Sequence, residues 1–139
     1  MTIEAHLHRN AVPAEPRNAI TLLTNGHHGW TADIEASAGG LEQSPSPHDL
    51  LDSALAACTT LTLELYIRRK ALAVRSLHVQ VDHVETRGAD GRVHYAIERR
   101  IRIEGDLADG DRQRLLEIAG KCPIHRVLEG QTTISSSLA

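Results

Sequence analysis

The chain has 139 residues, of which 41% are hydrophobic, 24% are charged and 2% are aromatic, and its net charge is −3. This length favours one domain with an aliphatic core, and the near-neutral charge excludes the basic footprint of a nucleic-acid-binding protein. No apolar run approaches the roughly 20 residues of a membrane span, and the N-terminal segment lacks the apolar core of a signal peptide, so we expect a cytoplasmic protein without membrane partners.

The N-terminal part predicts an irregular arm followed by a hairpin. Residues 1–17 show no periodicity and are expected to be irregular, with a single domain over residues 18–139. Strands are predicted over 19–24 and 28–36, joined at Asn25-Gly26, a pair that is typical of hairpin turns.

Residues 44–70 predict one long helix with a cysteine midway along its apolar side. Ser46 is expected to be the N-cap, Pro47 takes the first helical position, and Asp49 completes a capping box. Alanines flank the cysteine, so another backbone can approach this side closely. The apolar stripe is predicted to contain Leu51, Leu55, Cys58, Thr62 and Leu65.

The remaining segments predict a second hairpin, two short helices and a closing strand. Within the hairpin, Arg99-Arg100 is expected to break the strand register as a β-bulge. The first short helix is expected to be capped by Asp109 or Asp111, with Leu115, Ile118 and Ala119 facing inward, and Pro123 is expected to break the helix or restart it after Cys122. The fold class is therefore α+β. The predicted strands cover 74–86, 92–104 and 132–138, and the predicted helices cover 111–121 and 124–129.

Two separated cysteine motifs carry a family resemblance. SPSPHDLLDSALAACTTLTL contains Cys58 and KCPIHRVL contains Cys122, with EGDL between them and TTISSSLA at the end. On these motifs the chain resembles the osmotically inducible protein C / organic hydroperoxide resistance (OsmC/Ohr) family, from about Asn18 onward. The resemblance implies an OsmC-like fold in an intertwined homodimer, with the long helices packed at its centre and no cofactor.

The resemblance also implies a thiol-dependent peroxidase of the antioxidant stress response. Cys58 is expected to attack an organic hydroperoxide and become a sulfenic acid, and Cys122 to resolve it as a disulfide. A thiol reductant, which the sequence does not identify, would then restore both thiols.

The residues that would activate the thiol depart from the family pattern. Asp49 stands where relatives commonly have Glu, and it lies nine helical positions before Cys58, which places the two on opposite sides of one helix. His27-His28 stands where relatives often have Arg, and a histidine is cationic only part of the time near neutral pH. Further candidates for substrate binding are His48 and Arg126.

Three other interpretations stay open on the residues alone. Cys58 can be a small buried residue, and Asp49 is fully explained as a cap. A non-catalytic OsmC-fold protein that binds a small apolar ligand fits the two departures. Cys122 and His125 form a C-x-x-H that could hold a metal, although the nine histidines show no paired ligand spacing and we expect no metal site.

Overall fold

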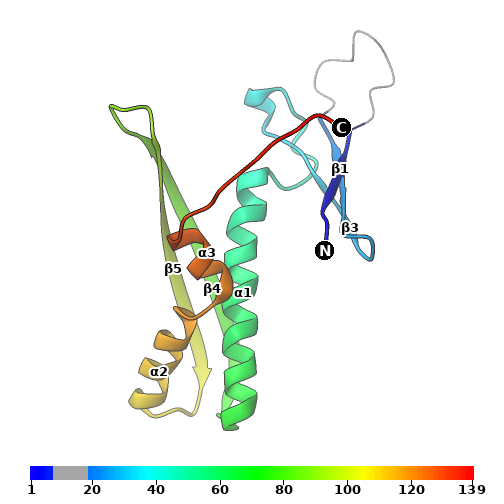
Figure 1. Cartoon of the computed structure of the whole chain (residues 1–139). Helices are drawn as coiled ribbons and strands as arrows, with labels where there is room; N and C mark the ends of the chain where they lie inside the picture. The colour runs from blue at the N-terminus through cyan, green and yellow to red at the C-terminus, as the bar shows by residue number, and fades with distance from the viewer. Residues whose placement is uncertain (8–18) are drawn as a thin grey trace. The chain divides into compact units, whose positions relative to one another are not determined.

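The computed structural model describes residues 1–7 and 19–139, which form two compact units, Met1–Leu51 and Asp52–Ala139. The boundary between the units falls inside helix α1 (Pro47–Lys70), the longest element (Figure 1). The α+β class is confirmed. A single domain over residues 18–139 stays a prediction.

The first unit contains a three-stranded antiparallel sheet, in the order β1 (Glu4–His6), β2 (Thr21–Thr24) and β3 (Gly29–Ala32). The hairpin at Asn25-Gly26 is confirmed, but β3 ends earlier than predicted and a 3₁₀ turn, η1 (Ala36–Ala38), follows it. The irregular arm is wrong for Glu4–His6, whose backbone pairs with the edge of β2. The rest of that arm lies outside the described residues.

Asp33 explains why β3 stops at Ala32. Its side chain is buried and accepts hydrogen bonds from the backbone N–H groups of Ile34, Leu41 and Gln43. Because these three donors converge on one carboxylate, the chain turns away from the sheet and forms an ordered loop. The same bonds favour the charged form and hold the pKa of Asp33 below its usual value.

Helix α1 begins as the sequence predicts, but it buries a different stripe. The Ser46 N–H donates to Asp49 Oδ2 over 2.8 Å and the Asp49 N–H donates to Ser46 Oγ over 3.1 Å, so the capping box is confirmed. Of the predicted stripe only Leu55 is buried, and Leu51 and Leu65 are exposed. The four-residue row that packs inward consists of Leu55, Thr59, Leu63 and Ile67.

The second unit is built on a long antiparallel ribbon of β4 (Val74–Arg87) and β5 (Val93–Gly105). The predicted bulge at Arg99-Arg100 is wrong, because Arg99 pairs in register with Val81 and the register shift lies between Val74 and Ser76. Side chains alternate across a strand, so Arg99 shares the inward face with the odd-numbered Tyr95, Ile97, Ile101 and Ile103.

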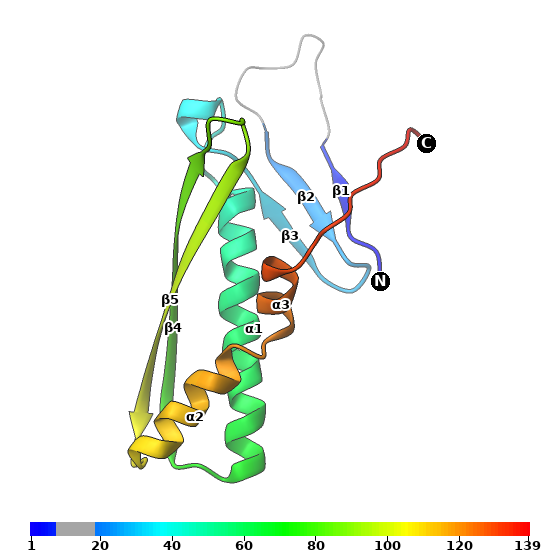
Figure 2. The ribbon, with the colours of Figure 1, turned by 60° about the vertical axis from the view of Figure 1, so that its left-hand side comes forward.

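Helix α2 (Asp109–Ala119) and helix α3 (Pro123–Glu129) follow the ribbon, and both views place α3 beside the middle of α1 (Figures 1 and 2). The N-cap of α2 is Ala108 without a side-chain cap, so the capping roles predicted for Asp109 and Asp111 are wrong. Both acids lie in the first turn, where the helix dipole favours negative charge. The core cluster joins α1 to α2 through Leu63, Ile67, Leu115, Ile118 and Ala119.

The predicted closing strand over 132–138 is wrong. Residues 131–139 form no regular structure, and Ile134 and Leu138 are exposed. A segment becomes a strand only where its backbone groups pair with another strand, and no such pairing is formed by this segment in the described part of the chain.

Helix α1 is long and apolar enough, by length and composition, to cross a membrane, so the expectation that no segment reaches this length is wrong. The core helix of a globular unit has the same properties, and α1 packs Leu63 and Ile67 against α2 and the ribbon.

The core can be tested with two adjacent leucines of α2. Leu115 is fully buried, whereas Leu116 is 56% exposed. We expect Leu115→Ala to lower the free energy of unfolding by about 2–5 kcal/mol, because it leaves a cavity, and Leu116→Ala to lower it by less than about 1 kcal/mol. Urea unfolding followed by circular dichroism measures both, and equal losses would contradict this assignment of the core.

The Asp33 carboxylate makes the stability of the first unit depend on pH. Its pKa is lower in the folded state, so the unfolded state binds more protons. The stabilisation is therefore present above the unfolded pKa of about 3.9 and is lost as the pH falls through the folded value. Fluorescence of Trp30, the only tryptophan, reports unfolding of this unit. Asp33→Asn should be less stable at neutral pH and should lose this acid dependence; an unchanged acid profile would exclude the carboxylate as its source.

Candidate functional site

The structure brings the two cysteines together in the second unit. Cys58 lies midway along α1 and is partly exposed, while Cys122 is fully buried and forms the N-cap position of α3. The two thiols are free and lie within hydrogen-bonding reach of each other. A reagent entering from solvent therefore meets Cys58 first.

The surroundings of the two thiols separate their acidities. Burial raises the pKa of the Cys58 thiol, and its hydrogen bond to Cys122 raises that pKa further. Burial also opposes ionisation of Cys122, but the Cys58 thiol, the backbone N–H groups of His125 and Ile124 and the Thr59 hydroxyl outweigh it and lower the pKa of Cys122. The Cys122 side chain forms no capping hydrogen bond with a backbone N–H of α3. These N–H groups therefore act on the sulfur through their dipoles, which point toward it and favour negative charge. The first proton lost by the pair thus leaves its charge on Cys122.

An inward arginine reaches this place from the ribbon. Arg99 Nη1 donates to Thr59 Oγ1 over 3.0 Å, and Arg99 Nη2 lies 3.2 Å from His125 Nδ1. Thr59 is fully buried and also donates to the Leu55 carbonyl over 2.8 Å. The sequence prediction missed Arg99 because it interpreted Arg99-Arg100 as a bulge. The unbroken alternation of Ile97, Arg99 and Ile101 was the signal that could have found it.

A cavity of about 420 Å³ adjoins this arginine. Its walls are four aliphatic side chains together with a phenol, a guanidinium, an imidazole and a carboxylate, the mixture typical of small-molecule sites. Neither cysteine lines it. The lining residues are Leu55, Tyr95, Ile97, Arg99, Leu116, His125, Leu128 and Glu129.

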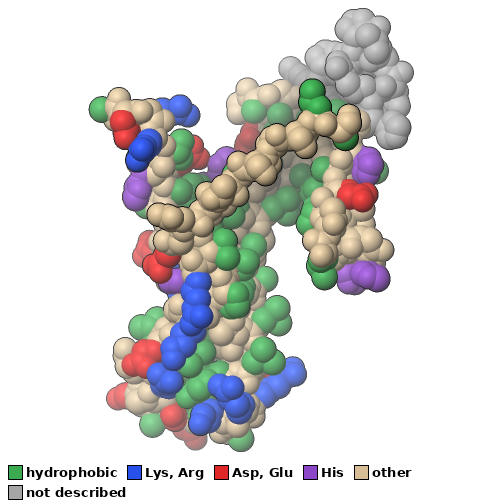
Figure 3. All heavy atoms as spheres, in the orientation of Figure 1, with side chains coloured by type: hydrophobic (Ala, Val, Ile, Leu, Met, Phe, Trp, Pro, Cys, Tyr) green, Lys and Arg blue, Asp and Glu red, His purple; other side chains and the backbone are tan. Residues whose placement is uncertain are grey.

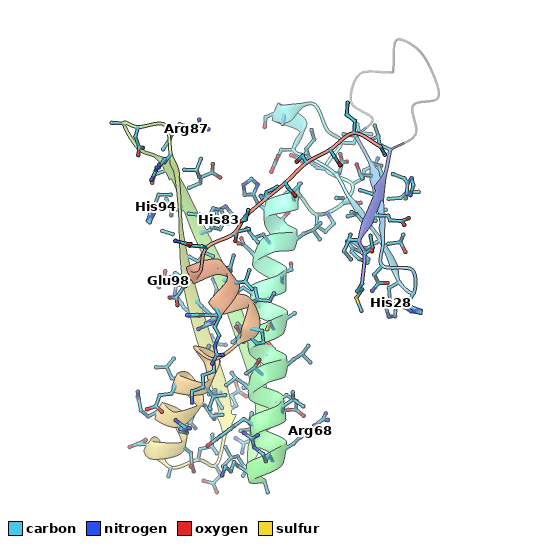
Figure 4. The ribbon with its side chains drawn as sticks, viewed as in Figure 1. His28, Arg68, His83, Arg87, His94 and Glu98 are labelled. Atoms are coloured by element: carbon cyan, nitrogen blue, oxygen red, sulfur yellow. The ribbon has the colours of Figure 1, made fainter. Side chains whose placement is uncertain are left out.

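A second polar cluster joins α1 to both strands of the ribbon. Asp52 Oδ2 lies 2.5 Å from His83 Nδ1, and Asp52 Oδ1 accepts from the Tyr95 hydroxyl over 2.9 Å. The two rings stack with centroids 4.5 Å apart, and Figure 4 shows His83 on the ribbon beside α1. Sequence reasoning did not single out these three residues. They satisfy one another's polar groups and orient Tyr95 at the cavity.

The other predicted site residues lie elsewhere. Asp49 takes part in the capping box of α1, and His48 is exposed in the same first turn. His27 and His28 are exposed in the β2–β3 turn, where the Asn25 side chain accepts from both backbone N–H groups. These residues belong to the first unit. Arg126 is exposed in the last turn of α3, four residues after Cys122.

Metal binding has no support from the geometry around His125. Its Nδ1 faces Arg99 and its Nε2 lies 3.0 Å from Glu129, so both ring nitrogens are engaged. Among residues 1–7 and 19–139, no group of three or more His, Cys, Asp or Glu side chains could hold a metal ion.

Comparisons with known proteins agree on one family. The chain matches the family model described as OsmC-like protein over residues 39–137; no curated protein matches it. An OsmC-like protein from Mycoplasma pneumoniae has the same fold, with a TM-score of 0.76 and 20% identity over 93% of this chain and 86% of that one.

Two solved structures with the same fold are named organic hydroperoxide resistance proteins. The protein from Legionella pneumophila has a TM-score of 0.69 and 17% identity over 94% of this chain and 90% of that one. The protein from Elizabethkingia anophelis has a TM-score of 0.70 and 20% identity over 94% and 89%. The family match covers most of the chain and includes Cys58 and Cys122, so the chain belongs to the OsmC-like family.

Proposed function

We propose that the protein is a thiol-dependent peroxidase that reduces organic hydroperoxides. The observation that carries this proposal is the pairing of a partly exposed Cys58 with a buried Cys122 inside an OsmC-like chain. Solved structures of the same fold are named organic hydroperoxide resistance proteins. A sulfenic acid formed at Cys58 has a second thiol within reach, which is what resolution as a disulfide requires.

The reaction balances with the two thiols and one external reductant. The pair first loses one proton, and the charge rests on Cys122. When a peroxide arrives, the remaining proton passes from Cys58 to Cys122, and the Cys58 thiolate attacks one peroxide oxygen. An S–O bond forms, the O–O bond breaks, and the alkoxide takes the proton from Cys122 and leaves as an alcohol. The Cys122 thiolate then attacks the Cys58 sulfur, the S–S bond forms, the S–O bond breaks, and the leaving hydroxide takes a proton from solvent to become water. Two external thiols, or one dithiol, then reduce the disulfide to two thiols and are themselves oxidised to a disulfide.

Access and polarity support an organic substrate. Cys122 is fully buried, so the attacking role belongs to Cys58. On α1 the neighbour of Cys58 four residues toward the N-terminus is Ala54, which is apolar and exposed. An apolar approach favours a hydroperoxide with a hydrocarbon body over hydrogen peroxide.

We also propose a homodimer that covers the exposed side of α1. Leu61 and Leu65 lie four residues apart on this side, the spacing of neighbours on one face of a helix, and Cys58 lies beside this row. Leu61 is 63% and Leu65 is 66% exposed, and Figure 3 shows hydrophobic side chains along α1. The predicted contributions of Asp49, His27, His28, His48 and Arg126 to substrate binding or activation stay predictions.

Intact mass and thiol counting test the peroxidase cycle. After an equimolar addition of cumene hydroperoxide, the wild type should lose both thiols and about 2 Da, and Cys122→Ser should gain about 16 Da as a sulfenic acid. Cys58→Ser should remain unchanged. Two unreacted thiols after long exposure to the hydroperoxide would contradict the peroxidase proposal and favour the non-catalytic, ligand-binding alternative. A sulfenic acid in Cys58→Ser instead would reverse the two roles.

Light scattering on a sizing column tests the homodimer. Leu61→Glu places a charge on the proposed interface and should convert a dimer into a monomer, because an unpaired charge in an apolar contact is costly. Val84→Glu is the matched control, since Val84 on β4 is equally exposed at 63%. A monomeric wild type, or a Leu61→Glu dimer as tight as the control, would be incompatible with this interface.

A further inference from the structure

We propose that Arg99 is a positioning residue for the cysteine pair, holding negative charge on the Cys122 sulfur through the Thr59 hydroxyl. The inference deepens the proposed function, because it concerns the ionised state of the same two thiols. It places a cation beside the cysteine pair on strand β5, rather than in the hairpin at His27-His28.

The guanidinium is held at this place by neutral partners. A guanidinium has only donors, so Arg99 Nη2, 3.2 Å away, must donate to an unprotonated His125 Nδ1. The His125 proton then lies on Nε2 and points to Glu129, 3.0 Å away. Thr59 Oγ1 accepts from Arg99 Nη1 over 3.0 Å. Arg99 is thus a fixed, half-buried cation between a neutral imidazole and a neutral hydroxyl.

The positive charge of Arg99 has no carboxylate partner within the described part of the chain. Glu129 is engaged by His125. The next residue, Arg100, faces outward and forms an ion pair with Glu98 over 2.9 Å. A half-buried cation without a counter-charge favours an anion nearby. The group beside Thr59 that can become an anion is the Cys122 thiol.

The Thr59 hydroxyl can transmit this effect because it has one proton and two lone pairs. Arg99 occupies a lone pair, which leaves the proton for the Leu55 carbonyl, 2.8 Å away, or for the Cys122 sulfur. Donation from a cation polarises the hydroxyl and strengthens the bond that it donates. If the hydroxyl proton turns to an ionised Cys122 sulfur, Thr59 loses its hydrogen bond to the Leu55 carbonyl and gains a stronger one to the thiolate.

The charged and titratable groups that contact Cys122, Thr59 or Arg99 come from three elements. Cys58 lies on α1, Arg99 on β5, and His125 with Glu129 on α3. Burial opposes the anion, and the interactions with Cys58, the start of α3 and Thr59 outweigh it, so the pKa of Cys122 is lowered. Arg99 strengthens the Thr59 contribution. The pair can then carry one negative charge without a cation from the first unit.

Ultraviolet titration of the thiolate in a Cys58→Ser background tests this directly, without peroxide. Serine keeps a donor to Cys122, and Cys122 becomes the only thiol. We expect Cys58→Ser/Arg99→Met to titrate at higher pH, with on the order of tenfold less thiolate near neutrality. Arg99→Lys should keep part of the effect, because lysine retains the positive charge but lacks the planar guanidinium that donates to Thr59 and His125 at once. Circular dichroism confirms that each variant is folded.

Two matched controls separate this role from general disturbance. Arg100→Met removes the neighbouring outward cation and should not move the titration. Thr59→Val should move it as Arg99→Met does, whereas Thr60→Val should not, since the Thr60 hydroxyl donates to the Ala56 carbonyl over 2.9 Å. If Arg99→Met fails to fold, the comparison of Thr59→Val with Thr60→Val decides.

If Arg99 acts through Thr59, the double variant Arg99→Met/Thr59→Val should titrate no higher than Thr59→Val alone. Coincident titrations of the Cys58→Ser protein with and without Arg99→Met would overturn the proposal, as would a full shift with Arg100→Met. Because no peroxide is used, an inactive enzyme with the expected titration would count against the proposed function and leave this role of Arg99 in place.

Discussion

One hydrogen bond, from Arg99 Nη1 on β5 to Thr59 Oγ1 on α1, joins the ribbon to the central helix beside the cysteine pair. It requires an arginine on the inward face of a sheet and a buried hydroxyl on the facing helix. His125 holds the other side of the guanidinium, so three elements meet at one cation. The Thr59 hydroxyl and the backbone N–H of His125 both act on the Cys122 sulfur.

Helix α1 carries two rows of side chains, one buried and one exposed. The inward row at spacings of four packs against the ribbon and α2, with Leu63 and Ile67 in the core. The outward row carries Leu61 and Leu65, which are exposed. Cys58 lies between the two rows and is therefore open enough to react and close enough to meet the buried Cys122. An α-helix has 3.6 residues per turn, so one sequence can support both rows.

The two thiols differ in burial and in the stability of their ionised forms. Cys122 has the environment that stabilises a thiolate, and Cys58 has the access. Their mutual hydrogen bond lets one proton serve both sulfurs, because moving it from one to the other changes the site of the charge without changing the total. Asp52, His83 and Tyr95 satisfy one another farther along the same helix and keep a second set of polar groups paired in this unit.

Local signals in the sequence predicted the elements well where one interaction of near neighbours decides the structure. The Ser46–Asp49 capping box, the Asn25-Gly26 turn, the restart of a helix at Pro123 and the long hairpin all depend on residues a few positions apart. The two cysteine motifs predicted the family and pointed to the two cysteines that the fold brings together.

Contacts between distant segments decided the rest. The helix stripe was wrong because apolar residues occupy both rows of α1, and only packing against α2 and the ribbon selects the row that is buried. The strand at 132–138 was wrong because a strand needs a partner that periodicity does not supply. Arg99 was missed although its alternation was visible, since an inward cation is favoured only by the hydroxyl and imidazole that the fold places around it. The sequence by itself determined the elements, the family and the two thiols; the tertiary structure alone decided which thiol is buried and which cation lies beside it, because burial and charge are properties of what surrounds a residue.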